Sequence, residues 1–358
     1  MKALVIGGTG PTGPYILEGL VKRGYDTTIY HRGIHEVELP FSVKHIHGDP
    51  FSSDLEGDLE GSRFDLVISN YGRLRNIAAL MAGKCERFIG VTGGPVYLGW
   101  INTAQTKTGF FETPCSETAA LNNDINQEKM GTRIAHGEHV VMEKHRLGGF
   151  KATIMRYPLV YGPYQLRSNI WPIVQRIIDG RQQIIVPGDG LQLQSLGYAA
   201  NCAHAILLAV DNPKAIGEVY NVADEKCYSL YDFIKLIVIA MGAKVTLITI
   251  NHPKAFEITR GYARAPQHRM FDISKITNEL GYKDIVHTPE AVKLSVKWSL
   301  NNRDEERKLA MVLDDPLSYE LEDQLITRWK HMMQNISDMT PSVPPKKDIK
   351  YEYGNSNH

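Results

Sequence analysis

Three glycines near the start of the chain have a spacing that suits the binding of a phosphate-containing ligand. Gly7, Gly10 and Gly13 follow a short apolar segment and precede residues that can begin a helix. Glycine permits a tight turn and lets backbone N–H groups approach a pyrophosphate, whose charge is favoured at a helix N-terminus. A plain strand–turn–helix corner is the alternative, but the βαβ context favours a dinucleotide site. Its predicted cofactor-binding residues are Gly7, Thr9, Gly10, Pro11, Thr12 and Gly13.

The end of the second apolar segment bears on which dinucleotide would bind. Residues 28–33 include no acidic side chain that could accept hydrogen bonds from a ribose 2′-hydroxyl. Arg32 instead offers a planar set of donors that suits a 2′-phosphate. The sequence therefore predicts NADP(H) in preference to NAD(H), unless Arg32 only caps a loop.

The elements that would position these residues alternate between strand and helix. Short apolar segments rich in Val, Ile and Phe predict strands at 2–7, 26–31, 43–47, 65–69, 87–92 and 152–157. Helices are predicted at 12–23, 72–83 and 126–147. This alternation is typical of an α/β fold with a Rossmann-type, doubly wound parallel sheet, which binds its ligand at the carboxyl ends of the strands.

After Pro158 the pattern changes to that of a smaller mixed α/β region. Helices are predicted at 170–180, 199–211, 229–241 and 272–280, and strands at 183–186, 218–222 and 245–250. Ser229 is expected to cap one helix and Gly281 to end another. The predicted domains are an NADP-binding Rossmann domain (1–165), a substrate-binding domain (166–300), a helical extension (301–338) and a flexible tail (339–358).

The composition limits the classes of partner. Lys+Arg and Asp+Glu both number 40, so the formal charge is zero, which argues against nucleic acid and anionic membranes. The four cysteines form no Cys-x-x-Cys pair, so we expect no metal site, no disulfide framework and a cytoplasmic location. A strand begins directly after Lys2, so no signal peptide is expected, and no apolar run is long enough to span a bilayer. A small-molecule substrate is expected, and a homodimer stays open.

Six short motifs in a fixed order give the chain a family resemblance. They lie at 7–13, 48–49, 91–97, 155–163, 187–190 and 272–282. On these motifs the chain resembles the extended short-chain dehydrogenase/reductases, the NAD-dependent epimerase/dehydratase family, over about residues 1–300. The resemblance implies further cofactor contacts from Asp49, Thr92, Arg133, Tyr157 and Pro158.

The resemblance fails at the family's Ser/Tyr/Lys triad. Gly93 stands at the position of the usual Ser or Thr, four residues before Tyr97. With Glu138 aligned on the family's Glu, Met130 replaces the Tyr and Ile134 replaces the Lys, and a second register on Glu143 restores neither. Met and Ile can neither transfer a proton nor hold a ribose, so the chain is expected to keep the cofactor site without the usual acid/base pair. Glu138 itself is expected to form an ion pair rather than to act as a base.

Other side chains could replace the missing pair. The candidates for catalysis are Tyr97, Thr92 and Lys129, although Lys129 and Arg133 could simply face solvent. Gln194 stands where relatives often carry a phosphate-binding arginine, which favours a less charged substrate. The predicted substrate-binding residues are Tyr97, Tyr164, Arg167, Trp171 and Gln194.

The sequence leaves two classes of function open. The favoured one is an NADP(H)-dependent oxidoreductase, a reductase of a small organic molecule with non-standard acid/base residues. The alternatives are an epimerase or dehydratase, or a non-enzymatic NADP-binding protein with a regulatory or RNA-associated role, like the chloroplast stem-loop binding proteins.

Overall fold

The computed structural model describes most of the chain in two separate units. The described residues are 1–34, 36–70, 72–101, 106, 111–123, 129–165, 168–263, 266–310 and 318–338. Residues 1–317 form one compact unit and residues 318–358 the other. Within the described part of the second unit, one helix is found, α12 (Tyr319–Asp338). The predicted flexible tail, 339–358, lies outside the described residues.

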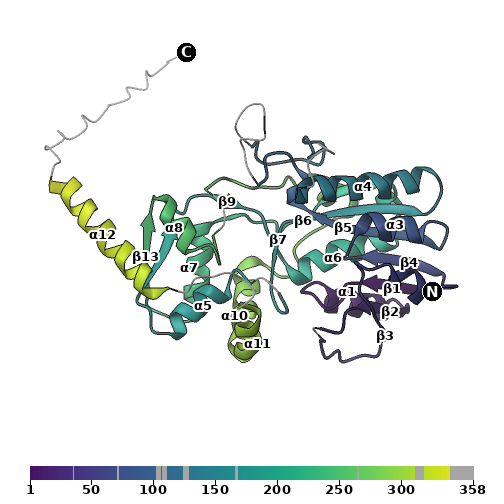
Figure 1. Cartoon of the computed structure of the whole chain (residues 1–358), viewed down its shortest axis with the longest axis horizontal. Coiled ribbons are helices and arrows are strands. Elements are labelled where there is room, and N and C mark those ends of the chain that lie inside the picture. Colours follow the sequence, from purple (N-terminus) through teal and green to yellow (C-terminus); the bar gives the residue numbers. More distant parts are fainter. Residues whose placement is uncertain are drawn as a thin grey trace, which may run out of the picture. The chain divides into compact units, whose positions relative to one another are not determined.

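A seven-stranded parallel sheet organises the first unit (Figure 1). Its strands in spatial order are β11 (Glu218–Asn221), β6 (Lys151–Tyr157), β5 (Cys85–Gly93), β4 (Phe64–Ser69), β1 (Lys2–Ile6), β2 (Asp26–His31) and β3 (Lys44–His47). The chain winds outward from β1 in both directions, so a crevice is expected at the carboxyl ends of β1 and β4. The α/β class and the doubly wound parallel sheet predicted from the sequence are confirmed.

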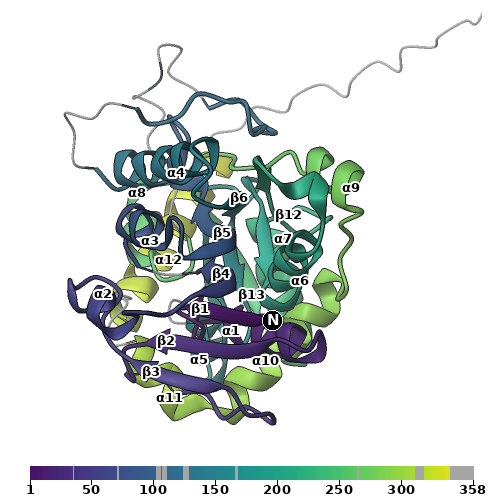
Figure 2. The same ribbon diagram turned by 90° about the vertical axis from the view of Figure 1, so that its right-hand side faces the viewer.

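Helices cover both faces of this sheet (Figure 2). One face carries α1 (Gly13–Lys22) and α6 (Ala199–Val210), and the other carries α2 (Asp54–Asp58), α3 (Leu74–Met81) and α4 (Met130–Arg146). Strand β1 shows why both faces are needed, because its side chains alternate between two cores. Ala3 and Val5 pack with α1 and α6, whereas Leu4 and Ile6 pack with α3 and α4.

A separate hydrophobic core lies in the later part of the same unit. The fully buried Trp171 begins α5 (Trp171–Ile178), which packs with α7 (Leu230–Ala240) and α10 (Thr288–Asn301). Three two-stranded pairs accompany these helices: β8 (Gln183–Pro187) with β13 (Thr246–Ile250), β7 (Leu159–Tyr161) with β10 (Leu196–Tyr198), and β9 (Leu193–Gln194) with β12 (Tyr228–Ser229). The remaining elements are α8 (Pro253–Ile258), α9 (Ser274–Leu280), α11 (Arg303–Ala310) and the short 3-10 turns at Gly94–Val96 and Pro213–Ala215.

Local signals placed most of these elements well. The Ser229 side chain accepts a hydrogen bond from the Asp232 N–H at 3.1 Å, and Gly281 ends α9 in the left-handed conformation, both as predicted. Helix α10 was not predicted. Strand β11 returns from the predicted substrate-binding domain to the edge of the main sheet, beside β6.

Two further features concern membrane-spanning helices and the state of the cysteines. None of the described helices is both long and apolar enough to cross a lipid bilayer. All four cysteines are free, and Cys85, Cys115 and Cys202 are buried.

Candidate functional site

The glycine turn between β1 and α1 is shaped by close backbone contacts. Gly7 has a φ of +81°, and its N–H donates to the Tyr30 carbonyl at 2.9 Å. A Cβ on Gly13 would lie 1.9 Å from the Gly8 carbonyl oxygen, so only glycine lets α1 begin this close to the turn. A Cβ on Gly10 would meet nothing within 4 Å. The turn therefore exposes bare backbone at Gly10, which is the shape that a pyrophosphate requires.

The turn forms one wall of a cleft of about 230 Å³ at the carboxyl ends of the strands. The lining residues are Gly7, Thr9, Gly10, Pro11, Thr12, His31, Arg32, Gly33, Ile34, Pro50, Asn70, Val91, Tyr157 and Val160. The Asn70 amide donates to Thr12 Oγ1 at 2.9 Å, and the Tyr157 hydroxyl donates to the Cys202 carbonyl at 3.0 Å. These bonds fix two walls of the cleft beside the bare backbone at Gly10.

Most of the residues predicted to contact a cofactor meet at this cleft. Gly7, Thr9, Gly10, Pro11, Thr12, Arg32 and Tyr157 line it. Gly13, Asp49, Thr92 and Pro158 do not line it, but each is the chain neighbour of a lining residue. Arg133 is exposed on α4 and is not among the lining residues. His31, Gly33, Ile34, Pro50, Asn70, Val91 and Val160 were missed, although most of them follow the ends of predicted strands.

A group of polar side chains lies between β5, β6, β11 and α4, and all of them are buried except Thr92, which is partly exposed. Arg156 donates to both carboxylate oxygens of Glu138, with a shortest distance of 2.6 Å, and to the Tyr97 hydroxyl at 2.8 Å. Thr92 Oγ1 donates to Glu138 Oε1 at 2.6 Å, and the Tyr97 hydroxyl donates to Asn221 Oδ1 at 2.6 Å. These five residues are called the buried network below. Glu138 forms the ion pair expected of it, with both partners less than 5% exposed.

Electrostatics in the buried network favour the paired state. Burial by itself lowers the pKa of the Arg156 guanidinium, but hydrogen bonds and charge from Glu138 raise that pKa above its ordinary value. Burial raises the pKa of the Tyr97 phenol well above its ordinary value, although Arg156 acts in the opposite direction. Tyr97 therefore stays protonated and bonded to its two partners at neutral pH.

The position of Tyr97 corrects the expectation that its phenol can reach a substrate. Its side chain has no exposed surface, it packs against Trp100 and Phe271, and it does not line the cleft. A phenol that donates to Asn221 and accepts from Arg156 has no free donor for a substrate. The geometry thus gives Tyr97 a structural place and offers no support for the catalytic and substrate-binding roles predicted for it.

The start of α4 carries the residues that stand where the family's acid/base pair is expected. Lys129 and Arg133 are exposed, and Met130 is 55% exposed. Ile134 packs against the hydrophobic cluster that contains Tyr97. None of these four residues lines the cleft, so the roles of Lys129 and Arg133 stay predictions.

The residues predicted to bind substrate are not brought together. Trp171 is 1% exposed in a hydrophobic core, which corrects its expected place in a pocket wall. Tyr164 lies against Trp298, with ring centroids 5.3 Å apart, and Gln194 is held in β9 beside Tyr228. Arg167 lies outside the described residues. A second cleft of about 270 Å³, which the sequence did not indicate, is lined by Gly188, Asp189, Leu191, Gln192, Asn251, Phe256, Pro266 and His268.

Comparisons with known proteins agree with this architecture. Residues 131–223 match the model of the NAD dependent epimerase/dehydratase family. The chain is 27% identical over 301 residues to the chloroplast stem-loop binding protein of 41 kDa b from Arabidopsis thaliana, covering 79% of this chain and 75% of that protein. It is 23% identical over 313 residues to a putative UDP-glucose 4-epimerase from Methanocaldococcus jannaschii, covering 84% and 98%.

A solved structure extends the similarity to most of the fold. The UDP-glucuronic acid 4-epimerase from Bacillus cereus, in complex with NAD, superposes with a TM-score of 0.66 at 20% identity, covering 84% of this chain and 99% of that one. Together with the parallel sheet and the glycine turn, these matches show that the chain is similar to proteins of the NAD dependent epimerase/dehydratase family, whose model its residues 131–223 match.

Proposed function

We propose that this chain is a nicotinamide-dinucleotide-dependent enzyme of the epimerase/dehydratase type. The observation that carries the proposal is the cleft at the carboxyl ends of the strands, where the bare backbone of Gly10 faces open space beside the start of α1. A bound dinucleotide would supply reversible hydride transfer there. The glycine turn would hold its pyrophosphate, and Tyr157 and Val91 would bound the cleft on the side of β5 and β6.

The reaction type rests on the relatives and differs from the reductase favoured by the sequence alone. The similar proteins named above include two epimerases, and a dTDP-glucose 4,6-dehydratase from Actinoplanes also matches, at 26% identity over 61% of each chain. The names of these enzymes all refer to nucleotide sugars, so a nucleotide sugar is the first substrate class to test. Gln194, in place of an arginine, still argues for weaker recognition of a substrate phosphate.

One side chain is placed to orient such a substrate beside the cleft. Thr92 is partly exposed at the end of β5, next to the lining residue Val91. Its hydroxyl proton is directed to Glu138, so its oxygen lone pairs are left to accept a hydrogen bond from a substrate hydroxyl. We assign Thr92 to substrate positioning, and no residue of the buried network to proton transfer.

The preference for NADP(H) over NAD(H) belongs to the same proposal. Among the described residues that line the cleft there is no carboxylate, whereas Arg32 lies there beside Gly33. A carboxylate would repel a 2′-phosphate, and a guanidinium would bind it. The relative from Bacillus cereus binds NAD, so this preference has to be measured on the present chain.

Calorimetric titration of the full chain with NADPH and NADH tests the cofactor. We expect NADPH to bind more tightly and Arg32→Ala to remove that preference, with NADH affinity little changed. Incubation with oxidised cofactor and UDP-glucose or dTDP-glucose, followed by chromatography, then tests for an epimer or a 4-keto product. Absence of binding by either dinucleotide would contradict the whole proposal, whereas tighter NADH binding would contradict only the role of Arg32.

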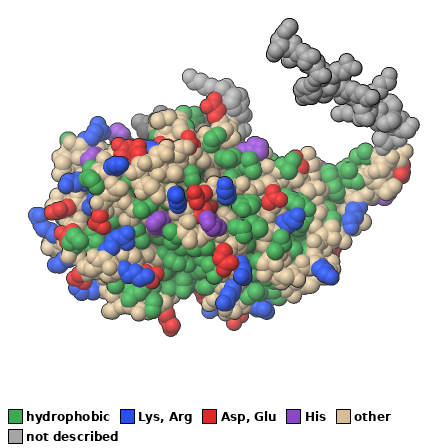
Figure 3. Space-filling model, turned by 180° about the vertical axis from the view of Figure 1, so that it is seen from behind, with side chains coloured by type: hydrophobic (Ala, Val, Ile, Leu, Met, Phe, Trp, Pro, Cys, Tyr) green, Lys and Arg blue, Asp and Glu red, His purple; other side chains and the backbone are tan. Residues whose placement is uncertain are grey.

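A second candidate function follows from the relative in Arabidopsis thaliana, which is named for stem-loop binding. The charge of this chain offers it little support. The net charge is zero, and basic and acidic side chains of the described residues are interspersed on the face drawn in Figure 3. Titration with a labelled RNA hairpin at two salt concentrations separates the candidates, because phosphate contacts give strongly salt-dependent binding. Salt-sensitive hairpin binding without any sugar-nucleotide turnover would favour the second one.

A further inference from the structure

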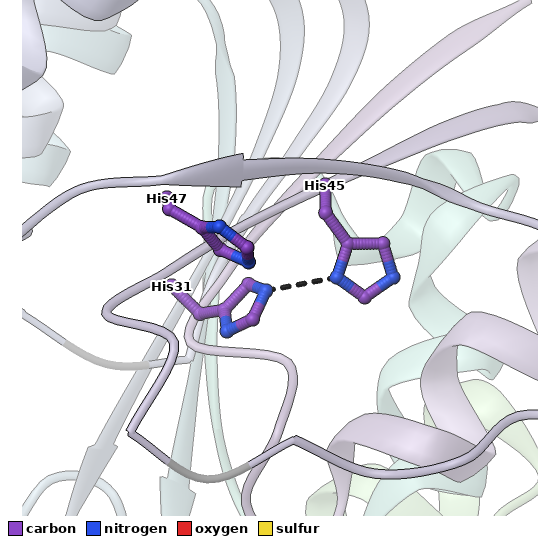
Figure 4. A group of neighbouring side chains, drawn as sticks. All are labelled: His31, His45 and His47. Atoms are coloured by element: carbon purple, nitrogen blue, oxygen red, sulfur yellow. Dashed lines mark hydrogen bonds between the residues drawn. The ribbon is translucent and has the colours of Figure 1, made fainter.

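The outer edge of the main sheet brings three histidines together on one face. His45 and His47 are two residues apart in β3, so the alternation of a strand places both side chains on the same side. The parallel register pairs His47 with His31 at the end of β2. Figure 4 shows the three rings gathered over the two strands. His31, His45 and His47 are called the histidine cluster below.

The distances within the histidine cluster are close to those of a metal site. His31 Nε2 and His45 Nδ1 are 2.9 Å apart, and each of the three residues offers a nitrogen within 4.8 Å of those of the other two. With zinc–nitrogen bonds of about 2.0–2.1 Å, two nitrogens on a tetrahedral ion lie roughly 3.4 Å apart. Small rotations are enough to reach this geometry, because His45 and His47 are exposed while His31 is held in place at 3% exposure.

A carboxylate stands at the same place. Glu36 Oε1 lies 3.0 Å from His47 Nε2, and both side chains are more than half exposed. An exposed contact of this kind is worth little in water, so it would not resist replacement by a metal bond. Three imidazoles and one carboxylate form a donor set that suits Zn²⁺ and its neighbours in the transition series.

Two hydrogen bonds of His31 have to be given up for it to join such a site, one with His45 Nδ1 at 2.9 Å and one with the Gly33 N–H. The Gly33 N–H donates to His31 Nδ1 at 3.2 Å, which leaves the proton on Nε2, the atom that faces His45. Coordination through Nε2 moves that proton to Nδ1, where it opposes the Gly33 N–H, so the bonds to Gly33 and to His45 are both lost. Metals bind the neutral form of an imidazole ring.

We propose that the histidine cluster, with Glu36 as the fourth ligand, binds a divalent transition-metal ion of the Zn²⁺ class. The ion would tie β2 to β3 and fix the end of the cleft that carries Arg32, since His31 also lines that cleft. None of the four ligands belongs to the glycine turn, so the site does not depend on the proposed enzymatic function. Cysteine spacing predicts no metal site, because the proposed ligands are histidines and a glutamate from β2, β3 and the segment between them.

The test uses the full chain after removal of metal with EDTA and dialysis. Calorimetric titration with ZnCl₂ is expected to give one ion per chain, and CoCl₂ is expected to give the intense visible absorption of a four-coordinate Co²⁺ site. The exposed ligands can be changed without opening the core, so His45→Ala, His47→Ala and the double variant are used. Each single variant should bind Zn²⁺ at least about tenfold more weakly, and Glu36→Gln should lose less.

A matched control and a clear contrary result complete the experiment. His331→Ala removes an exposed histidine from α12 and should leave Zn²⁺ affinity unchanged. Circular dichroism and thermal melting of the metal-free proteins check that the variants fold like the parent chain. Equal Zn²⁺ affinity in the parent chain and the double variant, or no saturable Zn²⁺ and Co²⁺ binding by the parent, would overturn the proposal.

Discussion

The two ends of the crevice at the carboxyl edge of the sheet differ in the place of their polar groups, which line a cleft at one end and are buried together at the other. At β1 and β2, called the open end below, the backbone of the glycine turn is bare at Gly10 and lines a cleft together with Arg32. At β5 and β6, called the closed end below, Glu138 and Arg156 lie beside the same edge. Both are less than 5% exposed, and they bond to each other within the buried network. Side chains that satisfy one another stabilise a fold, whereas a binding site has to leave some groups available to its ligand.

The contrast separates ligand binding from proton transfer. The open end offers the glycine turn whose shape suits a pyrophosphate, whereas the described residues of the buried network offer no accessible acid or base, and Met130 and Ile134 supply none. If the chain catalyses a reaction, the proton has to come from the substrate, from solvent or from a residue outside the buried network. Orientation of reactants alone can contribute a large part of a rate enhancement, so such an enzyme is workable.

The largest expected effect comes from breaking the closed end. Arg156→Met leaves the Glu138 carboxylate buried without its partner, and removal of one member of a buried ion pair typically costs about 3–5 kcal/mol. The free energy of unfolding, measured by urea denaturation, should fall by that amount. The double variant Arg156→Met with Glu138→Leu should recover much of the loss, because no charge is then buried unpaired.

Dinucleotide titration of the same variant sharpens the comparison. If the two ends are independent, Arg156→Met should bind NADPH nearly as well as the parent chain at a temperature where it is folded. A loss of stability below about 1 kcal/mol would mean that water can replace Arg156 as the partner of Glu138. The buried network would then be accessible to solvent.

The open end was easier to predict from the sequence because its geometry is local. Strand, glycine turn and helix follow one another within about twenty residues, and glycine spacing reports directly on backbone contacts such as that between Gly13 and Gly8. The caps at Ser229 and Gly281 are local in the same sense. Each of these features depends on residues only a few positions away.

The closed end depends on partners far apart in the chain, which no spacing reveals. Tyr97 is held by Arg156 and by Asn221, which is 124 residues away, so its phenol looked available when only its own motif was considered. The histidine cluster was missed for the same reason, because only the register of β2 with β3 brings His31 to His47. Trp171 was placed in a pocket because aromatic residues serve cores and binding sites alike.

The next prediction tests the open end with one methyl group. Gly10→Ala adds a Cβ that meets no protein atom, so the free energy of unfolding should change little. The same Cβ adds bulk to the wall where a pyrophosphate would approach the backbone, so the Kd for NADPH should rise by roughly tenfold, about 1.4 kcal/mol. Calorimetry and thermal melting on the same samples give both quantities.

Gly57→Ala is the matched control for that substitution. Gly57 is an exposed glycine in α2, and its added Cβ also meets nothing within 4 Å. Alanine there should leave NADPH affinity unchanged and increase helix stability slightly. Unaltered NADPH affinity in Gly10→Ala would show that the ligand does not approach this backbone.

The smallest expected effect concerns a carboxyl that borders the closed end. Glu117 Oε1 accepts a hydrogen bond from the Asn221 N–H at 2.8 Å, and the Glu117 carbonyl accepts one from Arg156 at 3.0 Å. Burial raises the pKa of the Glu117 carboxyl above its ordinary value of 4.5, although the Asn221 hydrogen bond and the charge of Lys275 oppose the shift. The folded chain therefore keeps a proton that the unfolded chain releases as the pH rises through 4.5.

Because the folded state holds more protons in this window, the contribution of Glu117 to stability falls as the pH rises from its ordinary pKa through its raised one. Glu117→Gln keeps an oxygen acceptor for Asn221 and cannot titrate. Its urea midpoint, relative to that of the parent chain, should therefore increase between about pH 4 and about pH 8. Glu86→Gln, which changes an exposed carboxyl on β5, is the control. A difference between variant and parent that stays constant with pH, or that shrinks as the pH rises, would mean that this carboxyl is not held by the closed end of the crevice.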